Sequence, residues 1–473
     1  MKTEHFDLVI LGAGSAGLVV AAVAAGLGYK TALLEGAEMG GDCLNYGCVP
    51  SKALLAAAHK AYAAAHLDKL GIRADVQVDF AKVMAHVHAV IAAIAPHDSE
   101  ERFSGLGVTV IREHGQLKDA HTIVTPTRTL TGRRIVIATG ARAFVPPIEG
   151  LANVPYLTNE TVFSLTEQPK HLLVMGGGPI GAELGQAFRR LGSKVTIIEA
   201  APRILGKDDP ELAEVVRSQL LSDGITLHEG KGITAVKGRA GSITLTLSDG
   251  TQVDGSHLLV AAGRAPNVEN LGLDAAGIDH TAKGIPTNKA MQTNKKHIFA
   301  IGDVTGPYQF THMAGYQAGL VIRRSLFGSL TTKADYRAVP WVTYTSPELA
   351  GIGMTEAQAR ATHGDSVRTV TVPLAQVDRA QAEKDTNGML KVITTKSGKV
   401  LGATLVGTQA GELIHAWAPF IQFGLPIRRM NDLIVAYPTR SDVHKRAASA
   451  YYKDALYAPT TRRISRLLFK LLG

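Results

Sequence analysis

The sequence predicts an α/β fold in which one strand–turn–helix–strand unit occurs twice. The first copy starts at the run DLVILGAGSAG, residues 7–17, and the second starts at HLLVMGGGPIG, residues 171–181. In each copy an apolar strand leads into a glycine-rich turn and a helix, and the next strand, TALLE or VTIIE, ends in a glutamate. This order of elements is typical of Rossmann-type domains, so the chain is expected to contain two of them.

Each copy carries the residues that a dinucleotide-binding turn requires. The glycines permit a tight turn and a close approach of the backbone to a pyrophosphate, which the start of the following helix stabilises. A glycine pattern alone is weak evidence, but two copies in the same context argue against coincidental structural glycines. The residues in question are Gly12, Gly14, Gly17 and Glu35 in the first copy, and Gly176, Gly178, Gly181 and Glu199 in the second.

The glutamate of the second copy bears on which nicotinamide cofactor is bound. Glu199 lies 18 residues after the third glycine, as Glu35 does in the first copy, and is expected to accept hydrogen bonds from a ribose diol. A carboxylate there repels a 2′-phosphate, so NAD(H) is favoured over NADP(H). Arg203 lies four residues further on and could weaken this preference.

The two cysteines of the chain, Cys43 and Cys48, stand in the run GGDCLNYGCVPSK, residues 40–52. A disulfide closing so short a loop removes little chain entropy, which argues against a purely stabilising bond. Pro50 opens a predicted helix, which puts Cys48 near a helix N-terminus where a thiolate is stabilised. The pattern therefore favours a reactive pair, with a passive disulfide or two buried thiols as the alternative.

Composition is that of a soluble enzyme, with 45% hydrophobic and 19% charged residues. The short polar start is unlike a signal peptide, and no uninterrupted apolar stretch approaches the length that spans a bilayer. The formal charge of +9 is explained by phosphate-bearing cofactors and a basic tail, without a nucleic-acid partner. A cytoplasmic location is expected.

The sequence resembles the class I pyridine nucleotide–disulfide oxidoreductases, which include dihydrolipoamide dehydrogenase, glutathione reductase and mercuric reductase. Besides the cysteine run, residues 134–150 resemble the connection out of the FAD domain and residues 258–267 the connection out of the NAD domain. Residues 298–306 are similar to the second FAD motif, and residues 342–359 to the start of the dimerisation domain.

The resemblance implies an NAD domain inserted in an FAD domain, a C-terminal α+β dimerisation domain, and a homodimer that binds FAD and NAD(H). The implied boundaries are 1–150 and 281–335 for the FAD domain, 151–280 for the NAD(H) domain, and 336–473 for the dimerisation domain. Electrons would pass between NAD(H), FAD, the Cys43–Cys48 disulfide and a small-molecule or protein-borne disulfide or dithiol, a lipoyl carrier among them.

The resemblance also implies a role for individual residues. Cys48 would contact the flavin and Cys43 would exchange with substrate. Lys52 would lie near flavin N5 with Glu183 as its acidic partner. The alternative interpretation of these two residues is a lysine on a helix surface and a glutamate that caps a helix. Asp303 would bind the ribityl chain, and the further cofactor-binding positions are Gly115, Gly140 and Gly263.

The sequence departs from the disulfide-reducing members at YPTRSD. Tyr437 stands where those members have a catalytic histidine, and Asp442 stands where they have a glutamate. A phenol with a pKa of about 10 is a poor base at neutral pH. His444 is a candidate replacement, although its spacing does not match.

A tyrosine near this position resembles mercuric reductase, as does the run at residues 377–392. That family's C-terminal cysteine pair and N-terminal metal-scavenging domain are not expected here, so a soft metal ion would meet only Cys43 and Cys48. No resident metal site is expected. Mercuric reductase-like metal reduction, a dihydrolipoamide dehydrogenase variant, an NADH oxidase or quinone reductase, and a non-catalytic redox sensor remain alternatives to a general disulfide reductase.

Residues 460–473 predict a basic amphipathic helix. Such a helix could pack onto the dimer or make peripheral contact with an anionic membrane surface, although it is too short to span a bilayer. Its apolar face would carry Ile464, Leu467, Leu468 and Leu471, with Arg462, Arg463, Arg466 and Lys470 on the others.

Overall fold

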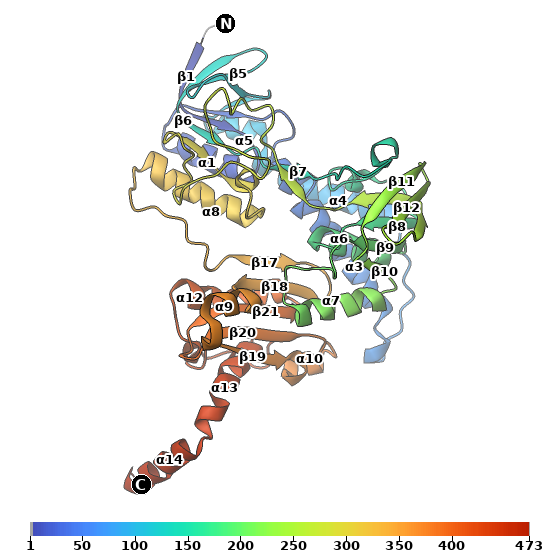
Figure 1. The fold of residues 1–473 in the computed structure, drawn as a ribbon, viewed down its shortest axis with the longest axis vertical. Helices are drawn as coiled ribbons and strands as arrows, with labels where there is room; N and C mark the ends of the chain where they lie inside the picture. Colours follow the sequence, from blue (N-terminus) through green and yellow to red (C-terminus); the bar gives the residue numbers. More distant parts are fainter. Residues whose placement is uncertain (1–2, 473) are drawn as a thin grey trace.

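The computed structural model describes residues 3–472, which fold into three bodies, each built around a β-sheet (Figure 1). The mixture of parallel sheets, covering helices and a C-terminal antiparallel sheet confirms the predicted α/β fold with an α+β domain at its end.

The first body is a seven-stranded sheet with the order β3-β2-β1-β6-β5-β4, in which β16 also pairs with β6. The strands from β3 to β6 and β16 run parallel, whereas β5 and β4 are antiparallel additions. Because the buried strands β1 and β2 are apolar on both faces, helices can cover both sides. The strands are β1 (Thr3–Leu11), β2 (Thr31–Leu34), β3 (Thr109–Ile111), β4 (Gln116–Leu117), β5 (Thr122–Val124), β6 (Thr129–Ile137) and β16 (Ile298–Ala300).

The helices of this body include the pair that carries the cysteines. Helix α2 (Gly41–Asn45) holds Cys43. Helix α3 (Cys48–Ala65) begins at Cys48, two residues before the predicted start at Pro50, so Cys48 lies at the helix N-terminus. The others are α1 (Ser15–Gly26), α4 (Phe80–Ile94), α5 (Glu100–Gly105) and α8 (Thr311–Val321).

One helical segment of this body, Phe80–Gly105, is 26 residues long and apolar enough to meet the length and composition of a membrane-crossing helix. The sequence pattern does not predict this segment, because polar residues interrupt it. Its side chains Phe80, Met84 and Val87 are buried in the core that α4 shares with α3 and α6, and the Phe80 ring lies 6.0 Å from that of Phe188. One face of α4 therefore packs on protein, while only 17% of the apolar window of the segment is buried.

The second body is a four-stranded parallel sheet with the order β10-β9-β8-β14, accompanied by an antiparallel sheet of β11, β12 and β13. The parallel strands are β8 (His171–Met175), β9 (Lys194–Glu199), β10 (Thr226–Glu229) and β14 (His257–Val260), and the others are β11 (Ile233–Arg239), β12 (Ser242–Leu247) and β13 (Gln252–Gly255). Helices α6 (Pro179–Arg190) and α7 (Pro210–Ser222) pack in its core.

A two-stranded antiparallel ribbon joins the first two bodies. It consists of β7 (Ala141–Ala143), where the chain leaves the first body, and β15 (Arg264–Pro266), where it returns. The second body is therefore inserted in the first, and β16 completes the first sheet after the return.

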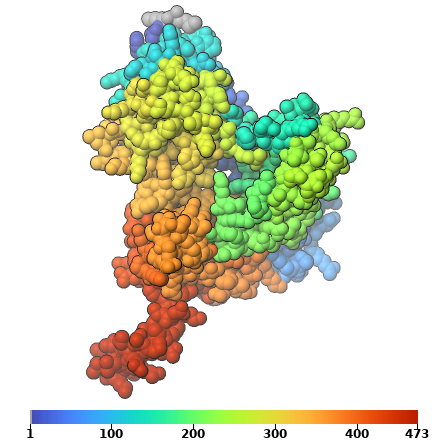
Figure 2. Space-filling model, in the orientation of Figure 1, coloured from blue at the N-terminus to red at the C-terminus, as the bar shows by residue number. Residues whose placement is uncertain are grey.

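The third body is an antiparallel sheet with the order β17-β18-β21-β20-β19 around a core that includes the fully buried Trp417. Its strands are β17 (Pro340–Thr343), β18 (Glu348–Gly353), β19 (Val367–Pro373), β20 (Met389–Thr395) and β21 (Val400–Gly407). Its helices are α9 (Glu356–His363), α10 (Asp378–Ala382), α11 (Ala410–Leu413), α12 (Ala418–Gln422), α13 (Asp442–Leu456) and α14 (Pro459–Leu472). Helix α14 extends away from the rest of the chain (Figures 1 and 2).

Candidate active site

A continuous cavity of about 2980 Å³ connects the two glycine turns with both cysteines. Ordinary small-molecule pockets reach roughly 1,000 Å³, so this cavity has room for more than one large cofactor. Gly17 and Gly181 are outside the lining, and so are Tyr437 and Asp442. The predicted residues that line it are Gly12, Gly14, Glu35, Cys43, Cys48, Lys52, Gly115, Gly140, Gly176, Gly178, Glu183, Glu199, Gly263 and Asp303.

The two glycine turns have the same geometry. Gly12 and Gly176 have φ values of +105° and +107°, in the region that only glycine adopts readily. A Cβ on either residue would overlap a carbonyl oxygen of the neighbouring strand connection, and a Cβ on Gly17 or Gly181 would overlap the first glycine of its own turn. The helix therefore starts against the strand, with its free N–H groups available to a phosphate.

The two glutamates are held alike by the backbone. Glu35 accepts hydrogen bonds from Ala13 N at 2.7 Å and Ala37 N at 2.8 Å. Glu199 accepts them from Gly177 N and Ala201 N, both at 2.7 Å. Each carboxylate oxygen keeps a second acceptor site, so both side chains are fixed beside the turns and can still bind a ribose diol. The two turns thus fit two dinucleotides.

Asp303 lines the same cavity as the first turn and the cysteines. Burial raises its pKa to about 6, although the neighbouring Arg264 guanidinium opposes the rise. Arg264 reaches Asp303 Oδ2 at 3.5 Å and also Asp42 Oδ2 at 3.2 Å. Asn159 donates a further hydrogen bond to Asp42 at 2.9 Å, so residues of the inserted body orient the residue that precedes Cys43.

The cysteines are free thiols with opposite proton affinities. Cys43 S–H donates to the Cys48 sulfur, and this bond together with burial raises the pKa of Cys43. The same bond lowers the pKa of Cys48 to about 6, with help from Thr311 and the Lys52 cation against the effect of burial. Thr311 Oγ1 lies 3.4 Å from the Cys48 sulfur. Cys48 is therefore a thiolate at neutral pH and Cys43 holds the proton.

Lys52 and Glu183 form an ion pair at 2.9 Å, although 131 residues separate them. Burial lowers the pKa of Lys52, but the Glu183 carboxylate outweighs that effect and the net shift is upward. Tyr344 of the third body contributes twice. Its ring centroid lies 4.4 Å from Lys52 Nζ, and its backbone N–H donates to Glu183 at 2.9 Å. All three bodies meet at this cation.

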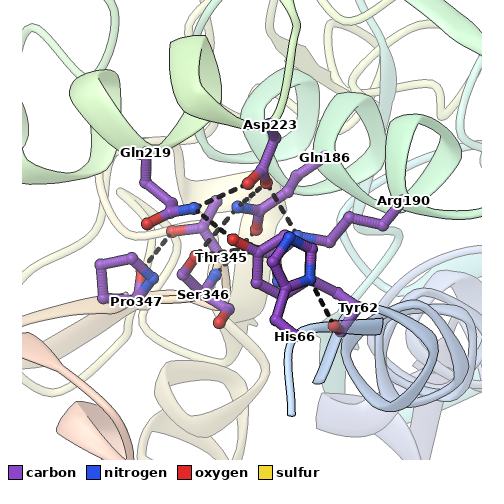
Figure 3. A network of polar contacts seen from close by, with 9 residues as sticks. All are labelled: Tyr62, His66, Gln186, Arg190, Gln219, Asp223, Thr345, Ser346 and Pro347. Carbon is purple, nitrogen blue, oxygen red and sulfur yellow. Dashed lines mark hydrogen bonds and ion pairs between the residues drawn. The ribbon is translucent and has the colours of Figure 1, made fainter. Parts of the chain in front are cut away.

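A second polar network links helices α3 and α6, which carry Lys52 and Glu183, to the end of α7 and to the loop after Tyr344 (Figure 3). Arg190 of α6 pairs with Asp223 at 2.8 Å, and both side chains are at most 2% exposed. The Arg190 guanidinium stacks 3.8 Å from the ring of Tyr62 on α3. Gln186 receives a hydrogen bond from Ser346 N at 2.7 Å and donates one to Asp223 at 2.9 Å. The network holds α3, α6 and the loop after Tyr344 in register.

The structure gives Tyr437, Asp442 and His444 three different environments. The phenol is 71% exposed and donates to Asp378 Oδ2 at 2.7 Å, which raises its pKa. Asp442, at the family's glutamate position, pairs with Arg446 at 2.5 Å. His444 is 2% exposed against Trp417, and burial lowers its pKa to about 4, which excludes it as a surface base.

Sequence reasoning misses several residues of the site. Asp378, Tyr344 and Arg264 all lie inside runs that the family resemblance singles out, so that resemblance is a signal that could have found them. Thr311 and Asn159 lie outside those runs. Thr311 contacts Cys48 from α8 of the first body and Asn159 contacts Asp42 from the inserted body, so both contacts arise only from tertiary packing.

Known proteins with a similar sequence or fold agree with this geometry. Residues 6–318 match the model of the pyridine nucleotide-disulphide oxidoreductase family, and residues 339–448 match the dimerisation domain of that family. A mercuric reductase of Lysinibacillus sphaericus is 34% identical over 96% of this chain and 84% of that protein. A dihydrolipoyl dehydrogenase of Chlamydia muridarum is 34% identical over 97% of this chain and its own full length.

Among solved structures, the Cu(II) complex of the HOCl-induced flavoprotein disulfide reductase RclA from Escherichia coli is similar to this chain. Its TM-score is 0.85 at 30% sequence identity, and the match covers 93% of this chain and 99% of that one.

Proposed function

Because the chain belongs to the class I pyridine nucleotide–disulfide oxidoreductases, we propose that Cys43 and Cys48 form a redox-active disulfide that delivers electrons to a disulfide substrate. The chain is an FAD-dependent, NAD(P)H-linked disulfide oxidoreductase, and its dimerisation domain supports a homodimer. The observation that carries the proposal is the meeting of both cysteines, the Lys52–Glu183 pair and two dinucleotide turns in one cavity.

The residues around Cys48 prepare the reductive step. FAD, when bound, accepts hydride from the reduced nicotinamide and supplies two electrons to the disulfide. The Lys52 ammonium, fixed by Glu183 and Tyr344, stabilises negative charge that develops on this side of the cavity. Once the disulfide is open, Cys48 stays a thiolate because its pKa is about 6, and Cys43 keeps the proton.

The acceptor step is a thiol–disulfide exchange. The Cys43 proton moves to Cys48 across their hydrogen bond, and the Cys43 thiolate attacks one sulfur of the substrate disulfide. That bond breaks, and the departing thiolate takes the proton from Cys48. Cys48 then attacks the Cys43 sulfur, releases the second thiolate, which solvent protonates, and restores the Cys43–Cys48 bond. Overall, NADH, H⁺ and one disulfide give NAD⁺ and two thiols.

We assign NADH as the preferred reductant. Glu199 presents a fixed carboxylate at the second turn. Arg203, which could attract a 2′-phosphate, donates instead to the carbonyl oxygens of its own loop, including Asp208 O at 2.7 Å. A phosphate at this position would meet the carboxylate without a free arginine to offset it.

Tyr437 is assigned to the acceptor side of the partner subunit's cavity, as the family resemblance implies. Its raised pKa keeps it a neutral phenol, and the Asp378 hydrogen bond orients it. It would position an acceptor by hydrogen bonding and would contribute little as a base.

The proposal is tested with FAD-loaded wild type and the Cys43→Ser and Cys48→Ser variants, using NADH with lipoamide or hydroxyethyl disulfide. We expect Cys43→Ser to lose about 100-fold or more in disulfide turnover because the attacking sulfur is gone. Single-turnover reduction of the flavin by NADH should remain near wild type in the same variant. Disulfide turnover within twofold of wild type in Cys43→Ser would overturn the proposal.

The same assay separates the remaining functions. Lipoamide turnover well above that of other disulfides would indicate a lipoyl carrier as partner. Cysteine-independent quinone or oxygen reduction would indicate an NADH oxidase or quinone reductase, and nucleotide binding without turnover a redox sensor.

A second candidate function is reduction of a metal ion as substrate. It is favoured by the mercuric reductase relatives and by the Cu(II) complex of the similar disulfide reductase. Among residues 3–472 no cluster of three or more metal-binding side chains is present, so a soft ion would be held chiefly by Cys43 and Cys48. NADH-dependent reduction of Cu²⁺ or Hg²⁺ that is lost in both cysteine variants would support this function.

A further inference from the structure

Helix α14 stands apart from the chain that precedes it (Figures 1 and 2). All of its residues are exposed except Thr461, which is half-buried. Ile464, Leu467, Leu468 and Leu471 are 58%, 59%, 48% and 71% exposed. Large apolar side chains gathered on one exposed surface are typical of an interaction site.

The helix separates its apolar and charged side chains onto opposite faces. With 3.6 residues per turn, the four apolar residues of the predicted face fall within an arc of about 100°, and Leu472 extends it. Arg462, Arg463, Arg466 and Lys470 fall within a second arc of about 100° on the other side of the helix. Phe469 lies outside the apolar arc.

The charge of this segment is of one sign. Residues 455–473 contain no aspartate or glutamate. None of the ion pairs formed within residues 3–472 involves the four basic residues of α14, so their charges face solvent. The helix therefore offers an anionic partner an unneutralised basic face beside an apolar one.

We propose that α14 binds the surface of an anionic lipid membrane. A helix of 14 residues is about 21 Å long, which is too short to cross a hydrocarbon core of about 30 Å but suits a position in the interface. In that position the leucines enter the acyl boundary and the arginines remain among the phosphates. This inference does not depend on the acceptor chemistry proposed above.

Charge complementarity favours lipid over a second copy of the chain as the occupant of this face. Two α14 helices packed through their apolar faces would leave all eight basic side chains without a carboxylate partner, because neither copy carries one, whereas anionic headgroups neutralise them. The match to the family's dimerisation domain ends at residue 448, ahead of α14, so the pairing of subunits in this family does not require the helix.

The experiment is co-sedimentation of the FAD-loaded full chain with vesicles of phosphatidylglycerol and phosphatidylcholine (1:1) or of phosphatidylcholine alone. We expect at least about tenfold tighter binding to the anionic vesicles, weakening as salt rises. The Leu467→Glu/Leu471→Glu variant should bind at least about tenfold more weakly, because it removes apolar contact and adds negative charge. Its NADH-dependent turnover of a soluble acceptor should be unchanged, which shows that it is folded.

Leu330→Glu is the matched control, because Leu330 is 81% exposed on a loop of the first body. This variant should bind vesicles like wild type. Equal binding to both kinds of vesicle, equal loss in Leu330→Glu, or retained binding in the α14 variant would overturn the proposal. So would a change from higher oligomer to dimer in the α14 variant, in the absence of vesicles, measured by analytical ultracentrifugation.

Discussion

The two Rossmann-type units share their turns but differ in the helix that comes after their second strand. In the first unit the next long helix, α3, begins at Cys48, and in the second unit α7 begins directly after Asp209. Cys48 is open to the cavity, and its neighbours lower its pKa to about 6. Asp209 is 3% exposed beside the buried Lys391, and burial raises its pKa.

The difference shows how one architecture serves two purposes. A helix N-terminus favours an anion in either unit, although burial outweighs this effect at Asp209 and raises its pKa. In the first unit that anion is a thiolate left accessible for exchange, and in the second it is a carboxylate tied to the third body through Lys391 and the Glu356 backbone N–H. The residue at the helix start and its exposure therefore determine its role. An accessible cysteine can react with a substrate, whereas a buried aspartate holds the third body against the second.

The largest effects are expected from alanine substitutions that test whether the two glycine turns bind different cofactors. Gly17→Ala and Gly181→Ala each introduce a Cβ against a carbonyl oxygen of the first glycine in the turn, which displaces the helix start. We expect Gly17→Ala to lose bound FAD on purification. Gly181→Ala should keep its FAD and lose at least about 100-fold in the rate of flavin reduction by NADH.

FAD content and stopped-flow flavin reduction measure these two losses separately. If Gly181→Ala lost FAD as readily as Gly17→Ala, the assignment of one cofactor to each turn would be wrong.

A smaller effect, on the preference for NADH over NADPH, is expected from substituting the glutamate of the second turn. Glu199→Gln keeps the shape and one acceptor oxygen but removes the charge that repels a 2′-phosphate. We expect the ratio of kcat/KM for NADH over that for NADPH to fall by about tenfold, the equivalent of one charge-assisted hydrogen bond. Steady-state kinetics with both nucleotides measure the ratio. Glu35→Gln is the control, and an equal fall in that variant would contradict the assignment.

The smallest expected effect is a shift in the pH at which the Cys48 thiolate, at the start of α3, takes up a proton. The pKa of Cys48 is lowered, so thiolate should form as pH rises through about 6 and disappear below it. The pH dependence of the charge-transfer absorbance in NADH-reduced enzyme reports this titration. Lys52→Met should move the midpoint upward, because it removes a cation that lowers the pKa. An unmoved or lowered midpoint would show that Lys52 does not act on the thiolate.

The parts of the site that could be predicted from the sequence are those with local signals. The glycine turns, their glutamates and the placement of Cys48 at a helix start are all encoded by spacing within some thirty residues. The Lys52–Glu183 pair spans 131 residues, and only the family resemblance predicts it.

Contacts that depend on how the three bodies pack could not be predicted. Tyr437 donates to Asp378, which lies 59 residues away in the sequence, so no local signal identifies it as the partner. Arg190 and Asp223 form a buried ion pair, and the Arg190 guanidinium stacks on Tyr62 of α3, a contact between segments that are distant in the sequence. Burial also excludes His444 as the replacement for the family's histidine base. Nothing in its sequence position indicates that it faces Trp417.

The ribbon of β7 and β15 makes the second unit a separable module. Its two strands pair antiparallel, with Ala143 opposite Arg264 and Ala141 opposite Pro266, so the inserted segment starts and ends at neighbouring points. A domain whose ends adjoin can be excised, exchanged or circularly permuted while the host keeps only a short gap to close. With NAD(H) assigned to the second turn, as proposed above, a replacement cassette could change the nucleotide preference provided that it keeps Glu183 and Asn159, which hold Lys52 and Asp42 beside the cysteines.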